Sequence, residues 1–153
     1  MTLLAKVARH GPADLLMVAE AMVLLAFFRL CLAVVPVRRI IGAITHGKAE
    51  PKQADSASGD AVSIDGRELS AAQRVQWAVV AVARHSVVEF VCFPQTLAAY
   101  TMLRWRRVQS TIVYGVARSP EGGLIAHTWL EVGDGFVTGG DEAQGFAAIE
   151  RWA

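Results

Sequence analysis

Residues 111–138 read TIVYGVARSPEGGLIAHTWLEVGDGFVT, and the fold class can be predicted from this part of the chain. β-Branched and aromatic residues fill three short runs, and segments rich in glycine separate these runs. Such runs with turn residues between them predict strands at 111–117, 124–132 and 136–138. Because the Gly-Asp-Gly turn at 133–135 is tight, we expect these strands to form an antiparallel meander.

The sequence before this meander carries helical signals. Ser70 and Gln73 have the spacing of a capping box, Pro94 suits a first helical turn, and Pro36 ends an apolar run. A last helix is expected after the strands. The predicted helices cover residues 14–35, 37–44, 70–85, 92–106 and 142–152. Helices followed by an antiparallel sheet predict an α+β fold.

Composition limits the protein class and the organisation of the chain. With 153 residues, 54% apolar residues and a net charge of +1, the chain is neither disordered nor strongly basic, so no nucleic-acid partner is expected. Two cysteines exclude a disulfide scaffold, and the composition fits a reducing, cytoplasmic compartment or a location near the membrane. A polar, Pro-containing stretch at 46–66 predicts a linker, with a candidate strand at 62–64. This linker separates an N-terminal apolar helical segment at 1–45 from a core at 67–153.

The apolar run at residues 15–35 is long enough to cross a bilayer. Glu20 and Arg29 oppose a span, because each central charge costs about 2.5–3.5 kcal/mol on insertion and the two lie on opposite helical faces. A cleaved signal peptide fits poorly, since an A-x-A site is lacking. A helix packed on its own domain or on a partner is therefore favoured, with a peripheral or inserted membrane helix as the alternative.

Cys92 is the most informative candidate for chemistry. A helix that begins beside it points unpaired N–H groups at the sulfur, which favours the nucleophilic thiolate and could stabilise an oxyanion. The alternative is a small buried core residue, as most free cysteines are.

His127 lies in the middle of the second predicted strand, where a rigid backbone would suit a general base. Its alternative is a hydrogen-bonded sheet histidine. Asp141 follows the third strand at about the distance that would return it to the level of His127, so we expect it to orient the imidazole, unless it caps the last helix. Asp134 stays the alternative orienter, although its turn alone would explain an aspartate there. These isolated residues lack metal-ligand spacing, and no nucleotide-binding loop occurs, so no metal and no cofactor are predicted.

Three stretches carry a resemblance to a known family: 92–103 (CFPQTLAAYTML), 113–116 (VYGV) and 126–132 (AHTWLEV). Their order resembles the transglutaminase-like, papain-related cysteine peptidase core, and more closely the lasso peptide biosynthesis B2 proteins. The apolar N-terminal helix is also similar to that family.

The resemblance implies a leader peptidase that cuts a lasso precursor peptide, with Cys92 as nucleophile, His127 as base and an aspartate as orienter. It implies three partners: the precursor, a separate leader-recognition protein and an ATP-using macrolactam synthetase. Two alternatives stay open. One is an acyltransferase with the same triad, and the other is a non-enzymatic membrane-associated scaffold built around residues 15–35.

Overall fold

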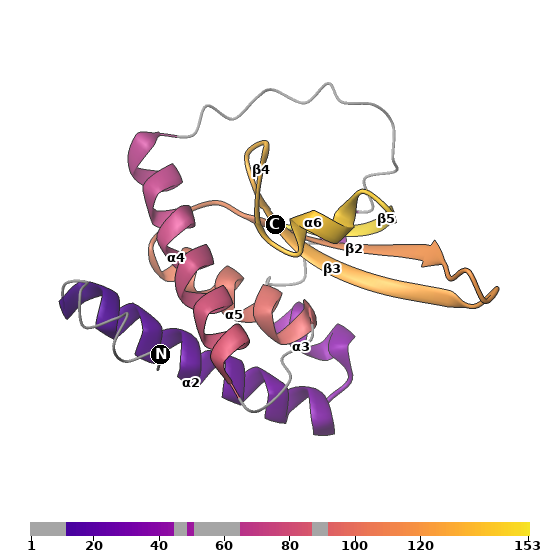
Figure 1. Cartoon of the computed structure of the whole chain (residues 1–153), viewed down its shortest axis with the longest axis horizontal. Coiled ribbons are helices and arrows are strands. Elements are labelled where there is room, and N and C mark those ends of the chain that lie inside the picture. Colours follow the sequence, from indigo (N-terminus) through magenta and orange to yellow (C-terminus); the bar gives the residue numbers. More distant parts are fainter. Residues whose placement is uncertain (1–11, 45–48, 51–64, 87–91) are drawn as a thin grey trace.

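The computed structural model describes residues 12–44, 49–50, 65–86 and 92–153, and it shows a layer of helices packed on one antiparallel sheet (Figure 1). The elements are α2 (Pro12–Val34), α3 (Val37–Ile44), β1 (Ala49–Glu50), α4 (Gly66–His85), α5 (Cys92–Trp105), β2 (Thr111–Arg118), β3 (Leu124–Val132), β4 (Gly135–Thr138), α6 (Gly140–Ala143) and β5 (Ala147–Trp152). The α+β prediction and the meander β2-β3-β4 are confirmed.

The sheet has the strand order β1-β5-β2-β3-β4. The C-terminal strand β5 runs antiparallel to β2, on the edge of β2 that β3 leaves open. The predicted helix at 142–152 is therefore wrong. The alanines and the glutamate of residues 147–152 favour a helix locally, but pairing with the free edge of β2 overrides that preference. Within 142–152, only Glu142 and Ala143 are helical, as the end of α6.

The start of α4 also differs from the prediction. The helix begins at Gly66, and Asp65 is its N-cap, with the Asp65 N–H donating to the Glu68 carboxylate at 3.3 Å. The capping box proposed for Ser70 and Gln73 is therefore wrong, because Asp65 and Glu68, with the same spacing five residues earlier, form the box. The two-residue strand β1 lies within the predicted linker. The candidate strand at 62–64 lies outside the described residues.

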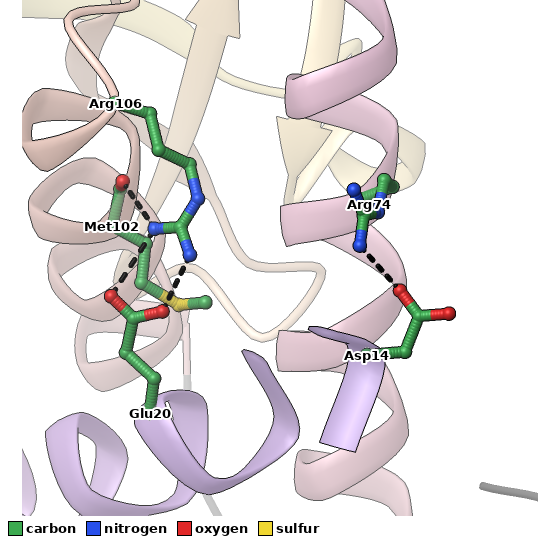
Figure 2. A network of polar contacts seen from close by, with 5 residues as sticks. All are labelled: Asp14, Glu20, Arg74, Met102 and Arg106. Carbon is green, nitrogen blue, oxygen red and sulfur yellow. Dashed lines mark hydrogen bonds and ion pairs between the residues drawn. The ribbon is translucent and has the colours of Figure 1, made fainter. Parts of the chain in front are cut away.

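Helix α2 forms the outer side of the helical layer, and α4 and α5 separate it from the sheet (Figure 1). Its packing face buries six apolar side chains: Met17, Val18, Ala21, Leu24, Leu25 and Phe28. Two ion pairs hold it in place, as Figure 2 shows. Arg106 donates to both carboxylate oxygens of Glu20, at 3.2 and 2.6 Å, and Arg74 donates to Asp14 at 2.6 Å. This is a helix packed on its own domain.

The two faces of the sheet have different environments. Ile112, Leu130 and Val132 join the main core beneath the helices. On the opposite face, Val113 and Trp129 form a smaller cluster with Ala143. Side chains alternate along a strand, so neighbouring residues of β3 serve different faces.

Candidate active site

Cys92 is the first residue of α5, as the sequence predicts, and its side chain is partly exposed. Pro94 lies buried in the first turn of this helix, where a missing N–H costs no helical hydrogen bond. The thiol is therefore placed at the end of the helix where backbone N–H groups are unpaired.

Thr96 fixes the beginning of α5 against the sheet. Its hydroxyl donates to the carbonyl oxygen of Thr128 at 3.3 Å and lies 3.3 Å from the hydroxyl of Thr138, and all three residues are buried. Residues four apart in a helix lie on one face, so Cys92 is one turn away from this anchor. Since Thr128 is the chain neighbour of His127, the anchor ties the cysteine helix to the histidine strand.

His127 is held on several sides. Its Nε2 lies 2.9 Å from the carbonyl oxygen of Gly139 and 3.3 Å from a carboxylate oxygen of Glu142. The ring stacks on Trp129, with centroids 6.1 Å apart, and lies 5.2 Å from the ring of Phe146. Its side chain is only 10% exposed. This imidazole has one defined orientation.

The partners of Nε2 determine the tautomer of the neutral ring. A carbonyl oxygen only accepts hydrogen bonds, so Nε2 carries the proton and donates to Gly139. Nδ1 is then the nitrogen with the free lone pair. Nδ1 is therefore the nitrogen of His127 that can accept a proton, and Nε2 holds the ring in place.

Trp129 is itself fixed by a polar chain on the same face. Its indole N–H donates to Glu131 at 2.8 Å, and Arg151 on β5 forms an ion pair with the same carboxylate. Because Trp129 stacks on the histidine, this chain of contacts supports the ring orientation from the sheet side.

No hydrogen bond joins Cys92 to His127 among the described residues, although Thr96 bonds the cysteine helix to the backbone of β3 next to His127. Helix α5 packs on the face of Leu130, whereas His127 shares the face of Trp129. Strand β4 pairs with β3 only between Leu130 and Val132, and beyond that ladder Gly139 lies against the β3 backbone at Thr128. Nucleophile and base contacts are often long in enzymes without substrate, so this geometry is compatible with catalysis.

The acidic neighbour of His127 is Glu142, which the sequence analysis did not single out. Asp141 is exposed and forms no hydrogen bond or ion pair with His127 in the described part of the chain. Strand β4 ends at Thr138, and Gly139 has a φ of 68°, which turns the chain into α6 and away from the expected ladder. The role proposed for Asp141 stays a prediction. Asp141 and Glu142 are neighbours in the sequence, so the signal that pointed to Asp141 as an orienter applies equally to Glu142.

The remaining candidates take no part in this geometry. Asp134 lies exposed in the turn between β3 and β4. Within the described ranges, no group of three or more His, Cys, Asp or Glu side chains is arranged to hold a metal ion.

Comparison with known proteins gives one match. The family model described as the transglutaminase-like superfamily matches residues 22–151, which extend from α2 to β5 and include Cys92 and His127. Neither a curated protein nor a solved structure matches the chain.

Proposed function

The chain belongs to the transglutaminase-like superfamily, with an α+β core of that type, and we propose that it is a cysteine peptidase that removes the leader from a lasso precursor peptide. One observation carries the catalytic part of the proposal. The Nε2–H of His127 donates to the Gly139 carbonyl, so Nδ1 is the nitrogen that can accept a proton, and Thr96 ties the helix that begins with Cys92 to the backbone of the same strand.

The proposed reaction uses only side chains and backbone of this protein. His127 Nδ1 accepts the thiol proton, and the Cys92 sulfur attacks the carbonyl carbon of the leader–core amide. N–H groups in the first turn of α5 stabilise the oxyanion. The imidazolium gives its proton to the leaving amine of the core peptide. The same base then activates water, which releases the leader as a free acid and restores the thiol.

The lasso substrate rests on the resemblance of residues 92–103, 113–116 and 126–132 to the B2 proteins. The partners proposed with it are a leader-recognition protein, which raises the local concentration of the precursor, and a macrolactam synthetase, which consumes the new amine. A cytoplasmic location follows from that reaction sequence.

A second candidate is an acyltransferase, because the superfamily contains cysteine hydrolases and transferases. It would use the same cysteine and histidine, with an amine in place of water. The product separates the two reactions: a peptidase gives a leader with a free carboxylate, and a transferase gives a leader with a new amide.

Mass spectrometry of a candidate precursor, incubated with this protein and the leader-recognition protein, tests the proposal. We expect leader release by the wild type and by Cys31→Ala, and none by Cys92→Ala. Cys31 is a matched control, because it is the other free, partly buried cysteine. Equal cleavage by Cys92→Ala would refute the assignment of the nucleophile.

Iodoacetamide labelling separates a wrong nucleophile from a wrong substrate, since it needs no precursor. Cys92 should react faster than Cys31, and His127→Gln should slow Cys92 alone. If Cys92 reacts no faster than Cys31 and its rate is unchanged in His127→Gln, the membrane scaffold becomes the better description of the chain.

A further inference from the structure

The outer face of α2 is exposed and apolar along its whole length. Seven large side chains on this face are between 45 and 76% exposed: Leu15, Leu16, Met22, Val23, Phe27, Leu30 and Val34. We call this set the α2 outer face. Among the described residues, α2 is also the one helix long and apolar enough to cross a membrane.

The α2 outer face is wide and has charges only at its borders. With 3.6 residues per turn, the arc from Met22 to Phe27 covers about 140° of the helix without a charged residue. Arg29 stands at one border, and Glu20, neutralised by Arg106, stands at the other. A single partner helix in a coiled coil needs only the narrow a/d seam, so the width favours a broad apolar environment.

Charge is divided between the two layers of the molecule. The described helical segments 12–44, 65–86 and 92–110 contain nine arginines and four acidic residues. Residues 111–153, which form most of the sheet, contain six acidic residues and two arginines. The helical layer is therefore positive and the layer with β3 and α6 is negative. An anionic lipid surface would attract the side on which α2 lies and repel the opposite side.

The packing of α2 argues against a transmembrane orientation. Its other face buries six apolar side chains against α4 and α5, and Glu20 is bonded to Arg106 (Figure 2). A span would expose this core and break the ion pair. A helix that lies in the membrane interface keeps both contacts and buries only the α2 outer face.

We propose that α2 lies flat on an anionic membrane surface, with the α2 outer face in the lipid boundary, Arg29 and Arg39 at the headgroups, and the sheet turned to water. Arg39 is exposed on α3, which continues the chain beyond Pro36. This attachment leaves His127 and Cys92 on the layers away from the lipid, and it does not depend on the proposed peptidase activity.

Vesicle sedimentation of the full-length protein tests the proposal, with vesicles of equal parts phosphatidylcholine and phosphatidylglycerol compared with pure phosphatidylcholine. We expect wild type to bind the anionic vesicles, and Leu16→Glu/Leu30→Glu to lose at least tenfold in binding, because each leucine loses its apolar burial. Arg29→Gln/Arg39→Gln should lose about fivefold per arginine on anionic vesicles only.

The matched control is Leu124→Glu/Ile149→Glu, which places the same charges on exposed apolar positions of the sheet, 77 and 51% exposed. It should bind like wild type. Thermal unfolding of every variant confirms that it is folded. The proposal is overturned if wild type does not bind anionic vesicles, or if both Glu pairs bind equally. It is also overturned if light scattering shows a dimer that only Leu16→Glu/Leu30→Glu dissociates while vesicle binding is unaffected, since a second copy would then cover the face.

Discussion

Replacing Gly139 with alanine should move the imidazole of His127. A Cβ built on Gly139 would lie 2.8 Å from Nε2 of His127 and 2.8 Å from the carbonyl oxygen of Thr128, whereas ordinary contacts begin at 3.4 Å. Relieving both contacts needs a shift of roughly 0.6 Å, because the backbone at Thr128 is held within the sheet. The imidazole is the part that can move, so its hydrogen bond to Gly139 should weaken.

Gly122 provides a matched control for the backbone part of this effect. It also has a positive φ, 88°, but a Cβ there would meet nothing within 4 Å. Both substitutions place alanine in the left-handed region, which costs about 1–2 kcal/mol of stability. Only Gly139→Ala adds the displacement of His127. Since a misplacement of about 1 Å can cost a hundredfold in rate, we expect at least a tenfold loss of kcat/KM for Gly139→Ala and little loss for Gly122→Ala.

Urea unfolding and leader release measured on both variants separate stability from positioning. The ¹⁵N shifts of the His127 ring give a readout that does not depend on the substrate: the Nε2–H tautomer should dominate in wild type and in Gly122→Ala, and its fraction should fall in Gly139→Ala. If Gly139→Ala keeps the same tautomer and the same rate as the control, the Gly139 carbonyl does not position the histidine.

Two further predictions concern the groups around the site. Glu142→Gln should lower kcat/KM in the leader-release assay by a few-fold, and by more than Asp141→Asn does. The reason is that Glu142, and not Asp141, contacts His127. A larger loss for Asp141→Asn would support Asp141 as the orienter. Thr96→Val should lower the free energy of unfolding by about 1–2 kcal/mol, because the Thr96 hydroxyl is bonded to β3 and β4. Thr128→Val should leave that free energy unchanged or raise it, because the buried Thr128 hydroxyl has no partner among the described residues. Urea unfolding of both valine variants would contradict this reasoning if the two values agree.

Most elements of the fold could be predicted because local sequence determines them. The meander follows from period-2 runs and turn residues, and the start of α5 follows from Pro94 beside Cys92. The end of the chain could not be predicted in this way. Residues 147–152 form a strand because β2 offers an unpaired edge, and a pairing partner some 35 residues away leaves no periodic signal in a six-residue segment.

The catalytic candidates were accessible to sequence reasoning only as single residues. Cys92 and His127 lie where predicted, on a helix start and a strand. Their mutual position depends on which face of β3 carries His127, which face α5 packs against, and how far β4 covers the edge of β3. Alternation assigns faces only once the packing is known, and β4 stops pairing at Leu130, so neither quantity follows from composition or spacing.

The sequence predicts an acidic side chain as the group that orients His127, but a backbone oxygen also contacts the imidazole. Glu142 reaches Nε2 at 3.3 Å, but its side chain is 69% exposed, and water screens such a charge strongly. The Gly139 carbonyl lies closer, at 2.9 Å, and the left-handed turn at that glycine fixes its direction. A backbone oxygen therefore supplies the better-defined part of the orientation, and the carboxylate adds to it when the ring becomes positive. Because every residue has a carbonyl, no side-chain pattern could point to this one. The indication in the sequence is the glycine itself, since only glycine combines the turn at 139 with the closeness of the imidazole.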